Sequence, residues 1–145
     1  MSGTVIDAET GKQIEGAVVL VEWTKTKGFG LTRTESYKVV EVLTDKDGKF
    51  KVSGVIDPFV DPHLTIYKKG YVAWNNDFTF PDYKKRINFK WGGTQLIRME
   101  KFKETYSHKQ HVSFIRDCIN NELAYNEKAK FREAFSWEID LAIKE

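Results

Sequence analysis

Residues 17–26, which read AVVLVEWTKT, are the stretch that decides the fold class. Valine and the other β-branched residues pack well on a pleated sheet, so this run predicts a long strand. Further short extended runs, separated by turn residues, lie on both sides of it: 4–6, 36–44, 49–52, 63–68, 71–80, 87–91 and 94–99. Many short strands with frequent turns are typical of a β-sandwich or a β-barrel.

Two turns indicate how neighbouring strands pair. Asp45-Lys46-Asp47-Gly48 lies between two alternating runs, and Asp-Gly in that position is a strong signal for a hairpin. Gly92-Gly93 lies between runs 87–91 and 94–99 and predicts a second hairpin. The sequence therefore predicts an antiparallel sandwich of seven to eight strands.

The pattern changes to a helical one after residue 103. Ser107 is a good N-cap residue, and apolar residues then recur at helical spacing up to residue 123. A second helix is predicted over residues 127–143, where Phe131 and Phe135 begin an apolar stripe. Because that apolar face is wide, we expect both helices to pack on the sandwich. The predicted division is a sandwich over residues 1–103 and a helical extension over residues 104–145.

The first half of the chain resembles a known family. Gly3-Thr4-Val5-Ile6-Asp7, Thr10-Gly11, Ile14, Gly16-Ala17 and Val19 resemble the opening of carboxypeptidase regulatory-like domains. Residues 44–50 are similar to the central hairpin of that family, and Lys69-Gly70-Tyr71 to a later turn. Gln13 departs from the pattern, where the family usually has proline. The resemblance covers about residues 3–72 and implies a transthyretin-like sandwich, non-catalytic and extracytoplasmic, of a kind often found in bacterial lipoproteins.

Composition and charge exclude some classes of partner. The 23 Lys and Arg residues balance 21 Asp and Glu residues, and a net charge of +2 gives no strong field for nucleic acid. Cys118 is the single cysteine, so no disulfide forms within the chain. The expected location is the periplasm or the outer cell surface. A lipid anchor would then require that a lipid-bearing cysteine stands in the native protein where Met1 begins this sequence.

Common catalytic motifs are absent from the sequence, which contains no G-x-S-x-G elbow, P-loop, H-E-x-x-H or dinucleotide fingerprint. Glu104, His108, His111 and Cys118 share one face of the first predicted helix and could ligate zinc. Ile115 interrupts that face, so core packing is the favoured interpretation. We therefore predict no enzyme activity, no metal and no cofactor, with a small hydrolase or metal-dependent enzyme as an alternative.

Aromatic residues on predicted loops mark the candidate binding site. If strands alternate in direction, the loops that carry Phe29, Phe59 and Tyr83 meet at one end of the sandwich. Exposed rings on supported loops suit a glycan or a protein partner. The alternative is that these rings tuck under the sandwich or against the helices.

A second candidate is the run 83–91, which interleaves bases with aromatics and suits an anionic ligand or a polysaccharide. Its favoured interpretation is a strand whose lysines discourage edge-to-edge pairing. Taken together, the sequence predicts an envelope-associated binding or structural module, monomeric or weakly oligomeric, with an unknown protein or glycan partner. A carbohydrate-binding accessory domain is the other alternative.

Overall fold

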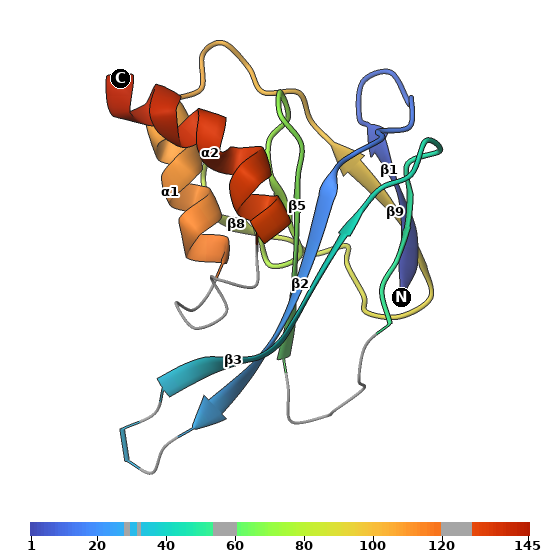
Figure 1. Cartoon of the computed structure of the whole chain (residues 1–145), viewed down its shortest axis with the longest axis vertical. Coiled ribbons are helices and arrows are strands. Elements are labelled where there is room, and N and C mark those ends of the chain that lie inside the picture. Colours follow the sequence, from blue (N-terminus) through green and yellow to red (C-terminus); the bar gives the residue numbers. More distant parts are fainter. Residues whose placement is uncertain (28–29, 32, 54–60, 120–128) are drawn as a thin grey trace.

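The computed structural model of the chain describes residues 1–27, 30–31, 33–53, 61–119 and 129–145 (Figure 1). Within these residues the elements are, in chain order, β1 (Ser2–Asp7), β2 (Val18–Lys27), β3 (Arg33–Leu43), β4 (Lys49–Lys51), β5 (Asp61–Tyr67), β6 (Trp74–Asn75), β7 (Phe78–Thr79), β8 (Lys84–Lys85), β9 (Thr94–Met99), α1 (His108–Cys118) and α2 (Ala129–Lys144).

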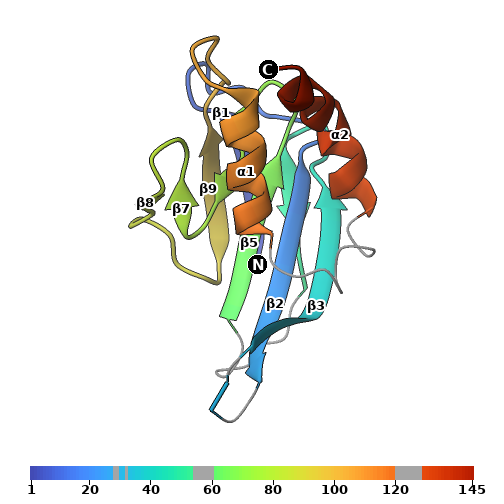
Figure 2. The same ribbon diagram turned by 90° about the vertical axis from the view of Figure 1, so that its left-hand side faces the viewer.

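These elements form three layers. A small sheet has the strand order β4-β1-β9, and a large sheet has the order β3-β2-β5-β6. The helices α1 and α2 cover the face of the large sheet that points away from the small one (Figure 1). The β7–β8 hairpin lies beside β9 (Figure 2). The protein is mainly β, with two packed sheets and two C-terminal helices.

Strand β2 is buried on both faces, which explains its nearly continuous apolar sequence. Val19, Val21 and Trp23 point towards the small sheet, whereas Val18 and Leu20 point towards the helices. Each of these side chains is at most 5% exposed. Burial of one such side chain contributes about 1.5–3 kcal/mol to stability. Because its two faces lie in different cores, β2 is the strand that joins them.

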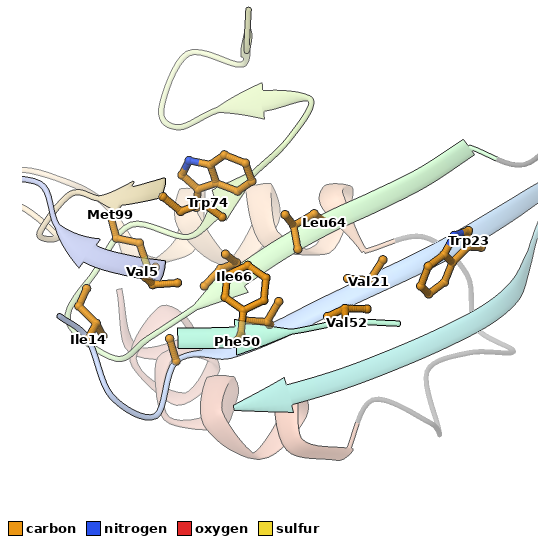
Figure 3. Close-up of a cluster of buried hydrophobic side chains, with 13 residues drawn as sticks. Val5, Ile14, Val21, Trp23, Phe50, Val52, Leu64, Ile66, Trp74 and Met99 are labelled. Atoms are coloured by element: carbon orange, nitrogen blue, oxygen red, sulfur yellow. The ribbon is translucent and has the colours of Figure 1, made fainter. Parts of the chain in front are cut away.

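The first core lies between the two sheets (Figure 3). It is built from apolar side chains of both sheets and of the loop after β1: Val5, Ile14, Ala17, Val19, Val21, Trp23, Phe50, Val52, Leu64, Ile66, Trp74, Ile97 and Met99. Gly48 lies in the turn that connects β3 of the large sheet to β4 of the small sheet. Its φ is +73°, and a Cβ there would lie 2.5 Å from the Val5 carbonyl oxygen. That position therefore requires glycine.

The second core lies between the large sheet and the helices. The ring of Tyr67 in β5 packs against Phe131 and Phe135 of α2, with centroid separations of 5.9 and 5.8 Å. Val112, Phe114 and other apolar residues of α1 complete this core. The helices thus pack on the sandwich, while the division of the chain into two domains at residue 103 stays a prediction.

The strand predictions need four corrections. The strands before and after residues 45–48 lie in different sheets, so this turn does not form the predicted hairpin. Among the described residues the sandwich has nine strands in three sheets, and not seven to eight strands. Strand β9 pairs with β1 in parallel, so the sheet is not wholly antiparallel. Residues 87–91 form no strand, and no hairpin joins them to β9 through Gly92-Gly93. Two parallel strands require a long connection, and most of the residues of the sandwich lie between β1 and β9 in the sequence.

Other local predictions are confirmed. Ser107 is the N-cap of α1, and its hydroxyl oxygen accepts a hydrogen bond from the backbone N–H of Gln110. Both predicted helices are present, although each begins or ends a few residues from its predicted limit. No helix among the described residues is long and apolar enough to cross a membrane.

Candidate functional site

A hollow of about 460 Å³ lies between the β7–β8 hairpin and the strand β9. Figure 2 shows the β7–β8 hairpin beside β9. It is lined by residues of β6, of the hairpin, of the segment that follows the hairpin and of β9: Trp74, Thr79, Lys84, Lys85, Arg86, Ile87, Asn88, Leu96 and Arg98. This volume is within the range of small-molecule and peptide sites.

Arg86 is the most firmly positioned cation of the hollow. Its backbone N–H donates to the Asp77 carbonyl oxygen (2.7 Å), and its Nε–H donates to the Asn75 carbonyl oxygen (2.6 Å). The guanidinium lies 4.4 Å from the centre of the Trp74 ring, a cation–π contact. Burial lowers the pKa of this guanidinium and nearby Glu100 raises it, but an arginine stays charged in a protein.

A local turn fixes the backbone to which Arg86 is anchored. The Asn75 side-chain oxygen accepts hydrogen bonds from the backbone N–H groups of Asp77 (2.8 Å) and Phe78 (3.1 Å). Asparagine favours turns of this kind because its short side chain bonds the backbone just after it. The turn connects β6 to β7, and these two strands contribute Trp74 and Thr79 to the lining of the hollow.

The ring of Trp74 lines the hollow, and two further aromatic rings pack in series against it. Trp74 is 8% exposed and meets Phe89 edge-on at 5.5 Å, and Phe89 meets Trp91 at 5.2 Å. Segment 86–91 therefore follows the edge of the large sheet instead of forming a strand with β9. Ile87 and Leu96, which are 84% and 52% exposed, form apolar edges of the hollow.

The charged side chains that line the hollow are all positive. Four cationic side chains and no carboxylate are among its lining residues. Lys84 forms an exposed ion pair with Asp82 outside the hollow, at 3.4 Å. Within the described part of the chain, no carboxylate forms an ion pair with Lys85 or Arg98. Lys85 and Arg98 are therefore the two cations of the hollow that a ligand with negative charge would meet without a competing ion pair among the described residues.

The sequence indicated this region in part. The run 83–91 was interpreted as either an anionic-ligand site or a protected strand, and strand was favoured. That preference is wrong for residues 87–91. Arg98 and Leu96 were not named as part of the site, because only the position of β9 beside the hairpin brings them there.

Of the three predicted binding residues, Tyr83 lies against α1. Its ring meets Phe114 edge-on at 5.2 Å, and its hydroxyl donates to Asp117 at 2.6 Å. The ring is still 41% exposed, and Tyr83 lies on the hairpin that borders the hollow. Phe29 and Phe59 lie outside the described residues. Ligand binding by Phe29, Phe59 and Tyr83 stays a prediction.

A buried polar cluster joins the helices to the large sheet. Glu138 of α2, which is 1% exposed, accepts hydrogen bonds from Nδ1 of both His108 (2.9 Å) and His111, and from the hydroxyl of Tyr67 (2.7 Å). Nε2 of His111 accepts a hydrogen bond from the backbone N–H of Ala73 at 2.9 Å. A backbone N–H only donates and a carboxylate only accepts, so Nε2 of His111 is the acceptor and Nδ1 is the donor in these two hydrogen bonds.

This cluster contains the two histidines for which the sequence offered a zinc site as the less favoured interpretation. Nδ1 of each points at Glu138 and carries the hydrogen that it donates. Cys118 is buried on the same helix, and burial raises the pKa of its thiol to about 12. Among the described residues, no three His, Cys, Asp or Glu side chains are placed to hold one metal ion.

Sequence reasoning missed a second polar array, on the large sheet. Nδ1 of His63 donates to Asp77 at 2.9 Å, and its Nε2 lies 3.3 Å from the hydroxyl of Thr24. Three residues from β2, β5 and the β6–β7 turn thus form a hydroxyl–imidazole–carboxylate series, an order known from nucleophilic enzymes. Thr24 is 5% exposed, so its hydroxyl is closed to a substrate in this structure.

Comparison with known proteins identifies no family. No family model matches the chain, and no curated protein matches it. Among solved structures it is similar to the shaft pilin SpaA from Lactobacillus rhamnosus GG, with 15% identity, a TM-score of 0.42, and coverage of 70% of this chain and 45% of the pilin. For the C-terminal domain of that pilin the identity is 16% and the TM-score is 0.37, with coverage of 70% of this chain and 95% of that domain. The likeness to carboxypeptidase regulatory-like domains stays a resemblance.

Proposed function

We propose that this protein is a non-catalytic binding module that holds an anionic ligand in the hollow between the β7–β8 hairpin and β9. One observation carries this proposal: the hollow presents Lys84, Lys85, Arg86 and Arg98 and no carboxylate. Arg86 is already fixed by two hydrogen bonds and a ring contact, so little side-chain freedom is lost when it binds.

The alternative of a small hydrolase has its best support in the Thr24–His63–Asp77 array. Its hydroxyl is nearly inaccessible, whereas the basic hollow is open to solvent. We therefore place the function in the hollow. An extracytoplasmic location and a lipid anchor belong to this proposal as expectations, and they rest on the family resemblance.

Binding of two labelled polyanions, polyglutamate and polygalacturonate, tests the proposal by fluorescence anisotropy. We expect at least one to bind, with an affinity that falls as salt rises from about 50 to about 200 mM, because exposed charges are screened. The double variant Lys85→Glu/Arg98→Glu is expected to bind about tenfold more weakly.

The matched control is Lys49→Glu/Lys51→Glu. It changes the net charge by the same amount, but it lies in a separate hollow of about 430 Å³ beside β1 and β4. This control is expected to keep the affinity of the unaltered protein. Equal loss in both double variants would attribute binding to net charge, and failure of both polyanions to bind would remove the proposal.

A further inference from the structure

Strand β9 is an edge strand, and its free edge borders the basic hollow. In the small sheet it has β1 on one side, and no described strand lies on its other side. Leu96 and Arg98 of β9 both line the hollow. An unpaired strand edge presents a row of backbone donors and acceptors that another extended chain can use.

The direction of the backbone groups along β9 follows from the hydrogen bonds at its ends. The carbonyl oxygens of Gly93 and Met99 accept from Ser2 and Ala8, at 3.2 and 2.9 Å, so odd-numbered residues face β1. Backbone groups alternate in direction along a strand, so even-numbered residues face the opposite edge. For Leu96 and Arg98, the N–H and C=O groups therefore point away from β1.

The chain beyond β9 supports this assignment and marks where the free edge ends. The Glu100 carbonyl accepts from Val72 N–H at 2.8 Å, and Phe102 N–H donates to the Gly70 carbonyl at 2.9 Å. These even-numbered residues use the outer edge to pair with segment 70–72. The edge is thus closed from Glu100 onward and is unpaired by any described strand at Leu96 and Arg98.

We propose that the ligand of the hollow is an extended acidic polypeptide segment that adds to β9 as a further strand. This inference rests on the proposed function, that the hollow takes an anionic ligand. Leu96 and Arg98 offer their backbone groups about 6.8 Å apart, the spacing that a second strand matches. Carboxylates of the segment then meet Lys85 and Arg98, and its apolar side chains meet the exposed Leu96 and Ile87.

A polypeptide fits the site better than an acidic glycan for two reasons. A glycan would use the cations but would leave the backbone edge of β9 unmatched. Leu96 and Arg98 are two residues apart and lie on one face of β9, so an added strand can place an apolar residue beside the first and an acidic residue beside the second. The same cations disfavour pairing of β9 with a second copy of this edge, because like charges would face each other.

A pair of synthetic probes separates strand addition from simple charge attraction. The first is an octapeptide in which Glu and Val alternate along one face, at every second residue with serine between them. The second is the same peptide with alternate backbone amides methylated. The two carry equal charge, but the second loses donors along one edge. We expect about tenfold weaker binding of the methylated peptide, and slower hydrogen exchange of the Leu96 and Arg98 amides when the first peptide is added.

Substitution of Leu96 supplies a second test in the full chain. Leu96→Pro removes one outward N–H and leaves the hydrogen bonds between β9 and β1 in place. It should therefore weaken binding of the unmethylated peptide about tenfold. Leu96→Ala also removes the apolar side chain but keeps that N–H, so it is the matched comparison and should weaken binding by no more than about threefold. The exchange measurement stands by itself if Leu96→Pro does not fold.

The possible outcomes distinguish this inference from the proposed function. Equal binding of both peptides, or unchanged exchange of the two amides, would overturn strand addition and leave an anionic site. Binding of polygalacturonate without binding of either peptide would assign the hollow to a glycan. If neither the peptides nor the polyanions bind, both the proposed function and this inference fail.

Discussion

At the scale of single residues, Glu138 connects three parts of the molecule. It belongs to α2, and it accepts hydrogen bonds from His108 and His111 of α1 and from Tyr67 of β5. Burial raises the pKa of its carboxyl, but the interactions with His111, His108 and Tyr67 together outweigh burial, so the pKa lies below its ordinary value of 4.5. A buried carboxylate is tolerated only when it is satisfied in this way.

Replacement of Glu138 should therefore be costly in a pH-dependent manner. We expect Glu138→Ala to lower the free energy of unfolding by about 3 kcal/mol near pH 7, because Tyr67 and the two histidines lose their shared acceptor. The folded-state pKa is depressed, so the carboxylate contributes its stability above pH 4.5 and loses it as pH falls through the folded pKa. Urea unfolding from about pH 7 to about pH 3 measures the loss of unfolding free energy in Glu138→Ala and its dependence on pH.

Tyr67→Phe is the control for that measurement. It removes one donor but leaves the carboxylate and both histidines, so it should cost about 1 kcal/mol and keep the acid dependence. A difference between wild type and Glu138→Ala that stays constant down to about pH 3 would contradict the assigned ionisation of Glu138.

The sequence predicts some of these residues and not their partners. His108 and His111 were placed on one face of a helix by their spacing, and α1 confirms this. Glu138 lies 27 positions beyond His111, and no local pattern relates the two. Tyr83 was expected on a loop, but its contact with Asp117 depends on where α1 packs. Spacing within an element can be predicted, whereas contacts between elements need the packing.

At the scale of elements, each helix begins against a carboxylate from elsewhere in the chain. Glu145 accepts from the backbone N–H groups of His108 (2.7 Å) and Lys109 (2.9 Å) at the start of α1. Glu41 of β3 accepts from the backbone N–H of Phe131 (2.7 Å) in the first turn of α2. The first N–H groups of a helix lack partners within it, and negative charge there is favourable.

The Glu41 contact ties α2 to the outer strand of the large sheet. We expect Glu41→Ala to lower the free energy of unfolding by about 1 kcal/mol, through loss of a charged helix cap. Thermal unfolding measures this loss, and exchange of the Phe131 amide should become faster. Glu15→Ala, an exposed residue in a turn, removes the same charge without a cap and should change stability by less than about 0.5 kcal/mol. Equal effects of the two substitutions would rule out capping by Glu41.

The pairing of strand β9 could not be predicted from local sequence signals. Gly92-Gly93 between two extended runs predicted a hairpin, and both glycines do have positive φ, 95° and 66°. The residues before them follow the large sheet, where Phe89 packs on Trp74, so β9 pairs with β1 instead. The prediction of a turn at Gly92-Gly93 is confirmed, whereas the prediction that β9 pairs with residues 87–91 is wrong. The free edge beside the hollow is a direct result of this arrangement.

At the scale of the whole molecule, the apolar run in β2 serves two cores. Val21 and Trp23 belong to the core between the sheets, and Leu20 belongs to the core under the helices. A strand buried on one face would alternate with polar residues. The sequence predicted this strand, and the reason for its continuous apolar character is the helical layer. Stability of the sandwich and of the helices should therefore be coupled through β2.

Phe131 of α2 tests that coupling, because it is 1% exposed in the core under the helices. We expect Phe131→Ala to lower the free energy of unfolding by about 3–5 kcal/mol, while Ile143→Ala, at a site 77% exposed on the same helix, changes it by less than about 0.5 kcal/mol. In Phe131→Ala, hydrogen exchange should accelerate for the amides of both β2 and α2, in one cooperative unfolding transition. If only the helical amides accelerate and the sandwich unfolds separately, residues 1–103 and 104–145 are independent domains.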